Sequence, residues 1–574
     1  MGAIKFKSNT RELRAECERV RRSLEAARAP FEKLWLELRK NIEPDLGKAL
    51  LGENEAEAAG ERDDSSIITS EPRIYLNRLA AGLQSGITNP ARQWFRFASR
   101  DKKAGKSARV RAWLDDATEA VASVLQNSNV YTSLELMYSH LGLFGTACGI
   151  LSMRDGLLHL RVIDEGAYWL AQNFKGRVDV CVVRHQMSVA QIREEFGDGA
   201  FEDFGGAEAR SKDGERTRTV WQLICPRERV RVGVPDIARE RPFLSVYWLG
   251  GGGDGAVNDG VLGIRSYGVN PIVAPRWKAS ASVYGTGPGK WALPEVKGLH
   301  ALELAGLRLV SAEVDPAMNA PESMRGKRIT TGPGGLNYVP DGVSLGGGRM
   351  LHRTLEPNAA AFQAKEGQST KNSGRIKMIF MADLFAMMMN ISVGKRQMTA
   401  TEVQELAAEK VMLLGPVLTR LDSDGLNPLL DGVWQMVFEA GLEAFPQLWE
   451  VPPQLRGVDV VAEYISALHI EQKRVSRLAG MSQLMEFSGG LAQFNPEVLD
   501  NIDFDKAVEI CADVLFEHGV VRDAKDVAAL RQGRAQAQQQ MQQQQQMLAA
   551  AGAAKDAAAA QRSQAQAAEL GTGD

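Results

Sequence analysis

The chain has 574 residues, of which 44% are apolar and 24% are charged, and its formal net charge is −3. The length requires several subdomains, and the charge excludes a generally basic nucleic-acid-binding surface without excluding local contacts. Five cysteines occur singly along the chain, and no apolar run approaches the ~18 residues that span a bilayer. We therefore expect reduced thiols without a disulfide framework or zinc site, no signal peptide and no membrane span, in a soluble intracellular protein.

Helical periodicity dominates the N-terminal part of the chain. Apolar side chains recur every three to four positions in four segments, residues 10–42, 70–90, 107–127 and 131–146. Pro30 interrupts the first segment, so we expect a kink or two abutting helices there. The arginine and glutamate runs of that segment are expected to form a solvated face, with nucleic-acid contact as the weaker alternative.

A change of period marks the region that follows. Residues 45–66 predict a loop, Asn89-Pro90 should end the second helix, and Trp94–Phe97 predicts a core strand. From Cys148 to about residue 250 apolar residues alternate in several short runs, and residues 261–278 add one or two more strands. The predicted fold class is α+β and mainly helical, with helices first and a sheet after them.

Two long helical patterns bracket an irregular segment in the middle of the chain. The first covers Leu293–Val314, begins after a Gly/Pro cluster and ends at Asp315-Pro316; the second covers Phe362–Ile391. The Gly- and Pro-rich residues 315–358 between them can form turns and short strands but hold no large core. This order predicts a helical hairpin with a small module at its tip.

The C-terminal part is expected to return to helices. Thr399 and Glu402 form a capping-box pattern that opens a helix to residue 421, with a bend at Gly415-Pro416, and residues 456–530 read as helical with a break near 487–500. Asp422–Gly425 matches half of a calcium loop, and an interhelical turn is the better interpretation. From Gln532 the chain is Ala/Gln-rich, which predicts disorder or a weak helix.

No catalytic, metal or cofactor constellation emerges from these patterns. Residues 285–290 (GTGPGK) are similar to a phosphate loop, but Tyr284 and Trp291 stand where that motif needs glycine and Ser/Thr, so a turn before a long helix is expected instead. Core or capping roles are expected for His140, His159 and His469. The aspartates of DNIDFD (500–505) are expected to cap a helix. We therefore expect a protein that is not an enzyme and that needs no cofactor.

Three small groups of basic residues are candidates for phosphate or partner contact, with a solvated face as the simpler alternative. The groups are Arg325, Lys327 and Arg328 between the long helices; Lys371, Arg375 and Lys377 on the second long helix; and Lys395 and Arg396 in the loop after it.

Several separated motifs together resemble the portal, or head-to-tail connector, proteins of short-tailed, T7-like bacteriophages. The most specific blocks are LAAGL-x4-TNPAR-x-WF within residues 70–97 and MTATEV within 396–405. The others are YGTGPGKWALPEVKGL (284–299), DPAM (315–318), LGPVLTRLDSDGLNPLL (414–430), YISALHIEQKR (464–474) and PEVLDNIDFDKAVEICADVLFEHGV (496–520). The resemblance runs from about residue 10 to 525 and leaves out the Ala/Gln-rich tail.

The resemblance implies an order of subdomains within a ring. Those subdomains would be a wing (1–290), a first stem helix (291–314), a clip (315–358), a second stem helix (359–389), a tunnel loop (390–398), a return to the wing (399–455), a crown (456–525) and the low-complexity tail (526–574). The first stem helix is apolar over a broad surface. A polar substitution at Leu299 or Leu302 is therefore expected to impair ring formation before it impairs folding of the monomer.

The same resemblance implies a conduit at one vertex of the capsid. A ring of usually twelve copies would let double-stranded DNA pass during packaging and ejection, with weak and non-specific phosphate contact through Lys395, Arg396, Lys371 and Arg375. Arg325, Lys327 and Arg328 would lie on the clip, where the terminase ATPase and later the tail adaptor and tail proteins dock. Major capsid and scaffolding proteins would be further partners, in the virion and, during assembly, in the host cytoplasm.

Two alternatives to a portal protein stay open at this point. One is another neck or adaptor ring component, against which the length and the order of the long helices argue. The other is a DNA-processing enzyme such as a terminase subunit, against which the missing Walker A motif and acidic catalytic cluster argue.

Overall fold

The computed structural model divides the chain into two compact units, Met1–Gln472 and Lys473–Asp574. None of the helices that it describes is both long and apolar enough to cross a membrane. The structure describes residues 10–51, 67–101, 104–154, 157–197, 217–230, 241–250, 261–279, 282–314, 318–319, 325–326, 352–353, 359–389, 414–439, 448, 450–457, 459–466, 468–470, 484–491, 502–508 and 524–570.

Four helices of the first unit match the predicted segments. They are α1 (Thr10–Asn41), α3 (Glu71–Ile87), α4 (Ala108–Gln126) and α5 (Val130–Phe144), with a short 3-10 turn, η1 (Lys48–Leu50), after the first. The prediction of a break at Pro30 was wrong, because α1 continues through it. Proline removes one helical hydrogen bond. Arg28 and Phe31 on either side are held by tertiary contacts: Arg28 donates to the carbonyl oxygens of Gly166 and Tyr168, and Phe31 packs against Tyr284.

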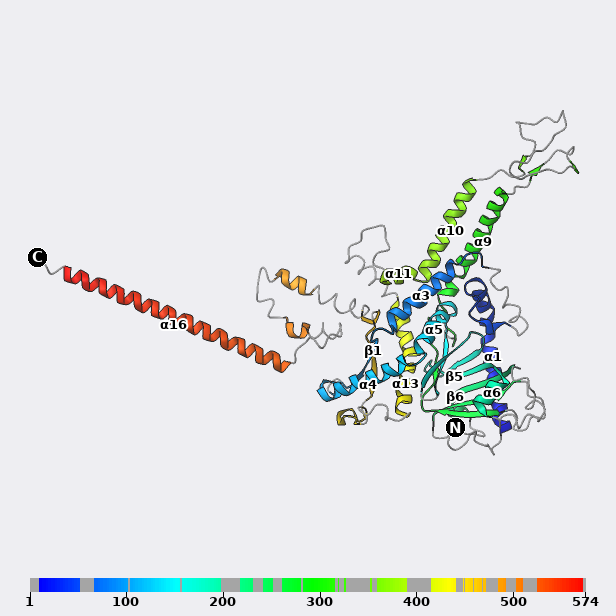
Figure 1. Cartoon of the computed structure of the whole chain (residues 1–574), viewed down its shortest axis with the longest axis horizontal. Helices are drawn as coiled ribbons and strands as arrows, with labels where there is room; N and C mark the ends of the chain where they lie inside the picture. The colour runs from blue at the N-terminus through cyan, green and yellow to red at the C-terminus, as the bar shows by residue number, and fades with distance from the viewer. Residues whose placement is uncertain are drawn as a thin grey trace, which may run out of the picture. The chain divides into compact units, whose positions relative to one another are not determined.

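A five-stranded antiparallel sheet has the order β4-β5-β6-β7-β8. Its strands are β4 (Tyr168–Gln172), β5 (Val178–Ser188), β6 (Thr217–Pro226), β7 (Phe243–Leu249) and β8 (Val261–Tyr267). Helix α1 covers one face, where Leu13, Cys17 and Leu24 pack with Val180, Val182, Leu223, Val246 and other side chains of the sheet (Figure 1). Alternate residues such as Leu170, Cys181 and Val183 belong to the main core on the other face. The strands predicted between residues 168 and 267 are therefore confirmed in the described part of the chain, except that Arg227–Arg229 form a 3-10 turn.

Arg21 and Arg28 of α1 are less solvated than the charge pattern indicated, whereas Arg19 and Arg22 are exposed as expected. The guanidinium of Arg28 lies 3.9 Å from the centre of the Trp169 ring, and that of Arg21 lies 4.7 Å from the Trp221 ring. Arg21 also bonds Glu18 and Glu25 on its own helix. These residues fasten α1 to the sheet, because a cation over an aromatic face adds to the apolar packing.

Two smaller sheets complete the first unit. One has the order β3-β2-β9, formed by β2 (Cys148–Arg154), β3 (Leu157–Ile163) and β9 (Ile272–Val273). The other pairs β1 (Phe95–Ser99) with β12 (Val460–Tyr464), so that Phe95 lies opposite Tyr464. The strand at Trp94–Phe97 is confirmed, whereas the helix expected from residue 456 was wrong at its start. Val460–Tyr464 is β-branched at its beginning and gains a ladder partner that is more than 350 positions away, which local periodicity cannot reveal.

Helix α6 (Val189–Phe196) was not predicted, although its sequence carries a capping box. Ser188 accepts a hydrogen bond from the backbone N–H of Gln191, and the Gln191 side chain accepts one from the N–H of Ser188. The spacing Ser-x-x-Gln before an apolar residue could have identified it.

The described cysteines Cys17, Cys148, Cys181 and Cys225 are free and buried. The sulfurs of Cys148 and Cys181 lie 3.8 Å apart, too far for a bond.

The helices of the middle region are α9 (Pro288–Val314), α10 (Ala359–Ile379), α11 (Ala382–Met389) and α13 (Asn427–Glu439). The second long helix was predicted as one piece and is two, separated at Phe380–Met381. The interhelical turn predicted at Asp422–Gly425 was also wrong: residues 414–421 are helical and continue into α13 through a π-helical turn, Asp422–Leu426. Its carboxylates are engaged, Asp422 by His469 and Asp424 by Arg276. The predicted cap at Thr399 lies outside the described residues.

The second unit is described in three helical pieces, residues 484–491 and 504–508 and α16 (Ala524–Leu570). The Ala/Gln-rich tail therefore forms a helix in the structure. Asp503 accepts the N–H of Lys506 at 3.0 Å, which confirms the capping role predicted for it, and Asp505 pairs with Arg531 at 2.6 Å. Asp500 lies outside the described residues.

Candidate functional site: the helical hairpin

The hairpin begins at a tight joint between the residues before α9 and the end of α5. A Cβ built on Gly289 would lie 2.2 Å from the carbonyl oxygen of Leu143, and one built on Gly287 would lie 2.8 Å from Cα of Gly145. Real Cβ atoms do not approach backbone so closely, so both positions need glycine. The glycines of GTGPGK (285–290) serve this packing. The predicted long helix is present, but it begins at Pro288 within the cluster and not at Leu293.

Tyr284 anchors the joint from the side of the core. Its hydroxyl accepts the backbone N–H of Leu170 at 3.1 Å, and its ring lies 5.2 Å from the rings of both Phe31 and Trp35. Burial raises the pKa of the Tyr284 phenol, which keeps the hydroxyl protonated. The start of α9 is thereby fixed to α1, α5 and β4.

The two halves of α9 differ in exposure. Ala292, Leu293, Val296 and Leu299 are buried in the main core, and Leu299 is only 1% exposed. The upper half exposes large apolar side chains: Leu304 at 36%, Leu307 at 57%, Leu309 at 46% and Val310 at 51%. The assignment of Leu299 to assembly was therefore wrong, since this side chain belongs to the core of its own chain. Leu302 is half-buried.

A polar seam that the sequence did not indicate joins α9 to α10. The carboxylate of Glu303 accepts hydrogen bonds from Lys365, at 2.8 Å, and from the hydroxyl of Ser369. These bonds, led by that from Lys365, lower the pKa of Glu303. Further along, Asn372 is buried against Gly298. The two helices run side by side (Figure 1), and the seam fixes their register because Lys365 and Ser369 of α10 both bond Glu303 of α9.

A sharp bend ends α10 and directs α11 onto α3. Met381 has φ 53°, the only non-glycine residue with positive φ in the part of the chain that the structure describes. Phe380 and Phe385 on either side are buried, and Phe385 packs so closely on Gly82 that a Cβ there would lie 2.1 Å from it. A left-handed conformation costs such a residue roughly 1–2 kcal/mol. Burial of the two phenylalanines offsets that cost.

The predicted contact residues are only partly described. Lys371 and Arg375 are exposed on α10, four positions apart and so on one face, and neither forms an ion pair with another described residue. Lys377 instead pairs with Asp383 across the bend at 2.5 Å. Arg325 is exposed in a turn. The remaining predicted residues, Lys327, Arg328, Lys395 and Arg396, lie outside the described residues.

The far end of the hairpin is closed by a two-stranded pair. β10 (Met318–Asn319) and β11 (His352–Arg353) are antiparallel, with Met318 opposite Arg353. This pair agrees with the short strands predicted within residues 315–358.

The histidines occupy structural positions rather than a common site. His469 bonds the hydroxyl of Ser466 and the carboxylate of Asp422, and His140 is buried near Asp164 and Glu165, as core or capping roles require. The expectation for His159 was wrong, since its side chain is exposed on β3. Among the described residues, no three His, Cys, Asp or Glu side chains are grouped to hold a metal ion.

Comparisons with known proteins identify a family and relatives that this chain resembles. The model of the family described as bacteriophage head to tail connecting protein matches residues 14–515. The portal protein of Salmonella phage epsilon15 is 32% identical over 524 residues, which cover 90% of each chain. The probable portal protein of Bordetella phage BPP-1 is 30% identical over 525 residues, with the same coverage. A solved structure described as the virion of a native gene transfer agent particle matches with 14% sequence identity, over 64% of this chain and 85% of the chain in that structure. The TM-score of this match is 0.27, which is too low to indicate a shared fold.

The family match spans most of the chain and includes α1, the sheets, the hairpin and α13. The chain therefore belongs to the family of bacteriophage head-to-tail connecting proteins.

Proposed function

We propose that the chain is a portal protein, which forms a ring at one vertex of a phage capsid and lets double-stranded DNA pass during packaging and ejection. Its family and the printed names of its two relatives support this role. Twelve copies per ring, as the sequence resemblance implies, is part of the proposal. The match to the head-to-tail connecting family disfavours the alternative that the chain is a terminase-like enzyme. A separate neck adaptor ring is disfavoured because both relatives are named as portal proteins over nearly their whole length.

The proposed subdomains follow the helical hairpin. Residues 291–314 and 359–389 are the stem, 315–358 the clip and 390–398 the tunnel loop. The wing comprises 1–290 and 399–455. The crown, expected from residue 456, is proposed to begin after Gln472, because β12 pairs with β1 in the first unit.

The observation that carries the proposal is the exposed apolar surface of upper α9. Leu304, Leu307, Leu309 and Val310 are 36–57% exposed, and Phe362 and Met378 on α10 are 44% and 74% exposed. Fully burying a leucine or valine side chain yields about 1.5–3 kcal/mol, so covering the four residues of α9 yields roughly 3–6 kcal/mol per chain. Soluble proteins rarely leave such a surface uncovered. Neighbouring hairpins in a ring would cover it.

Contact with DNA in this conduit is proposed to be weak and independent of sequence. Lys371 and Arg375 on α10, together with Lys395 and Arg396 in the proposed tunnel loop, are the candidate phosphate contacts. Each phosphate neutralised by a cation deepens binding at that position, and a ring multiplies every charge. A chain of net charge −3 therefore suits a channel that must release DNA as readily as it holds it.

The chain is proposed to act without catalysis of its own. Translocation would be driven by a terminase ATPase docked at the clip, near Arg325, Lys327 and Arg328, where tail adaptor and tail proteins dock later. Major capsid and scaffolding proteins would contact the ring in the virion and during assembly in the host cytoplasm.

Residues 342–346 match the letters G-x-S-x-G, but their Gly-rich surroundings lack the alternating apolar strand pattern that this nucleophile motif requires.

Negative-stain electron microscopy of the purified chain tests the proposal. Rings with a central channel wide enough for a duplex are expected. Monomers with ATPase or nuclease activity would overturn it. Replacing Lys395 and Arg396 by alanine should leave the rings intact and alter packaging or retention of DNA; loss of rings would instead make the loop an interface element.

A further inference from the structure

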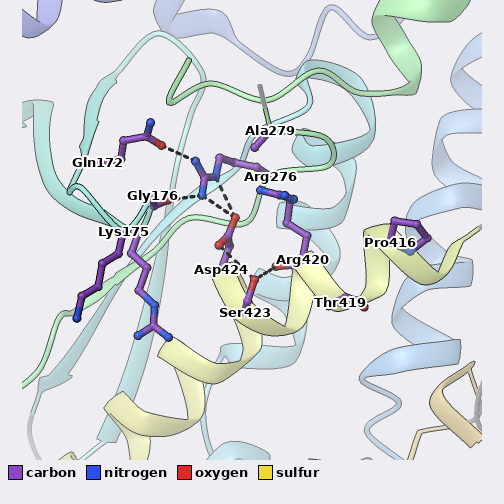
Figure 2. A pocket seen from close by; sticks show the side chains of 11 residues that line it. Gln172, Lys175, Gly176, Arg276, Ala279, Pro416, Thr419, Arg420, Ser423 and Asp424 are labelled. Carbon is purple, nitrogen blue, oxygen red and sulfur yellow. Dashed lines mark hydrogen bonds and ion pairs between the residues drawn. The ribbon is translucent and has the colours of Figure 1, made fainter. Parts of the chain in front are cut away.

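A polar cavity of about 430 Å³ lies where three segments of the first unit meet. These segments are the turn between β4 and β5, the residues after β9, and the helical residues that lead into the π-turn (Figure 2). The lining includes Gln172, Lys175, Arg177, Arg276, Arg420 and Asp424. None of the described basic residues assigned to DNA or partner contact above lines this cavity.

One wall is fixed by a buried arginine. Arg276, from the segment after β9, is 3% exposed and bonds the other two segments: Nε donates to Asp424 at 2.9 Å, Nη1 to the side-chain oxygen of Gln172 at 2.9 Å, and Nη2 to the carbonyl oxygen of Gly176 at 2.7 Å. Figure 2 shows these bonds meeting at one guanidinium. The network neutralises Arg276 with the one carboxylate of the lining and holds the cavity open in a defined shape.

Three further cations line the same cavity without such neutralisation. Lys175, Arg177 and Arg420 form no ion pair with any residue that the structure describes, and Asp424 is already engaged by Arg276. Arg177 acts on Asp431 only at longer range, where it partly offsets the burial that raises the pKa of that carboxyl. The lining therefore keeps three positive charges close to a concave surface, where they repel one another.

The chemistry of this lining favours one class of ligand. Guanidinium groups match the paired oxygens of phosphate, and a phosphate brings more charge than one carboxylate. The volume is at the lower end of that of small-molecule sites, which run from about 300 Å³. Few apolar groups line the cavity, so an apolar ligand has little to contact.

We propose that this cavity is a phosphate-binding site, held in shape by Arg276 and charged by Lys175, Arg177 and Arg420. The phosphate can come from free phosphate or from the backbone of DNA. Either source would supply the negative charge that the lining lacks. The proposal concerns binding by each chain and does not depend on the portal function.

Titration calorimetry of the full chain with inorganic phosphate tests the proposal, at constant ionic strength with chloride as the reference anion. Saturable binding is expected. Arg420→Ala and Lys175→Ala should each weaken it at least tenfold, because each removes a charge-assisted contact. Arg111→Ala, which removes an exposed arginine of α4 that does not line the cavity, should leave the affinity unchanged.

A second arm identifies the source of the phosphate. Fluorescence anisotropy of a short labelled duplex measures DNA binding by the same variants. Weaker duplex binding in Arg420→Ala and Lys175→Ala, and competition by inorganic phosphate, would assign the DNA backbone. Duplex binding equal to that of the Arg111→Ala control would assign free phosphate.

Two results would overturn the proposal. The first is phosphate binding that is not saturable, or that is equal in the Arg420→Ala, Lys175→Ala and Arg111→Ala variants. The second is loss of assembly in Lys175→Ala without phosphate binding by the original chain, which would assign the cavity to an acidic group of a neighbouring copy. If Arg420→Ala lowers the melting temperature, Lys175→Ala decides, because the exposed lysine does not contribute to the core.

Discussion

Substitutions at two positions of the single helix α9 should affect folding and ring assembly separately. Leu299, which is 1% exposed, packs in the main core, whereas Leu307, two turns further on, is 57% exposed. We predict that Leu299→Ala destabilises the monomer and that Leu307→Asp leaves the monomer folded but prevents ring formation. The two variants lie on the same helix, so each serves as the control for the other.

The magnitudes of the two effects follow from burial. Truncating a fully buried leucine costs about 2–5 kcal/mol, which is a large part of the stability of a domain. A substitution at an exposed position usually changes stability by less than about 0.5 kcal/mol. In a ring, Leu307→Asp would lose about 1–2 kcal/mol of apolar burial and would add the larger cost of burying a carboxylate without a partner.

Thermal melting, followed by size-exclusion chromatography with light scattering, distinguishes the two outcomes. Leu299→Ala should melt at a clearly lower temperature, and Leu307→Asp should melt like a folded monomer and elute as one. The reasoning fails if Leu307→Asp assembles as well as the original chain. It also fails if Leu299→Ala melts unchanged.

Three further predictions concern the interior and the hairpin. Burial lowers the pKa of His185 from 6.5 to about 4, so between these pH values the unfolded chain binds a proton that the folded chain does not. The free energy of unfolding should therefore fall by up to about 3 kcal/mol as the pH drops from 6.5 to 4. Denaturant titrations across this range should show a smaller fall in the His185→Gln variant. Gly289→Ala should lower the melting temperature by a destabilisation of about 1–3 kcal/mol, since its Cβ would meet the Leu143 carbonyl; an unchanged melting curve would contradict the joint. Glu303→Gln should cost about 1 kcal/mol and increase hydrogen exchange in α10, because Lys365 loses its charged partner on α9; unchanged exchange would speak against the seam.

Local pattern was sufficient for most helices and strands of the first unit. The segments α3 and α4 each bury one face, α5 does so up to its fully buried last turn, and the strands of the large sheet are bounded by turn residues, so periodicity and burial largely agree. The Gly/Pro cluster at the start of α9 was interpreted as a turn and not as a phosphate loop, because the neighbouring residues fail the phosphate-loop pattern.

The errors lie where tertiary contacts override local signals. Pro30 stays within α1 because contacts on both sides hold the helix, and Val460–Tyr464 becomes a strand because β1 offers a partner. At Met381 the helix breaks without glycine or proline, since two buried phenylalanines fix the chain on either side. None of these causes is visible within one window of sequence.

The candidate site was predictable in outline and not in detail. The hairpin and its exposed basic residues Lys371 and Arg375 follow from sequence, whereas the seam at Glu303 depends on which residues of two helices meet. Leu299 was misassigned because apolar periodicity shows that a side chain is buried and does not show by which chain.

A cryo-electron microscopy reconstruction of the assembled protein tests the central claim most directly. The α9–α10 hairpins are expected to surround a channel wide enough for a duplex, with Leu304, Leu307 and Val310 covered by the adjacent copy. An assembly in which these side chains face solvent, or a protein that stays monomeric, would contradict the account.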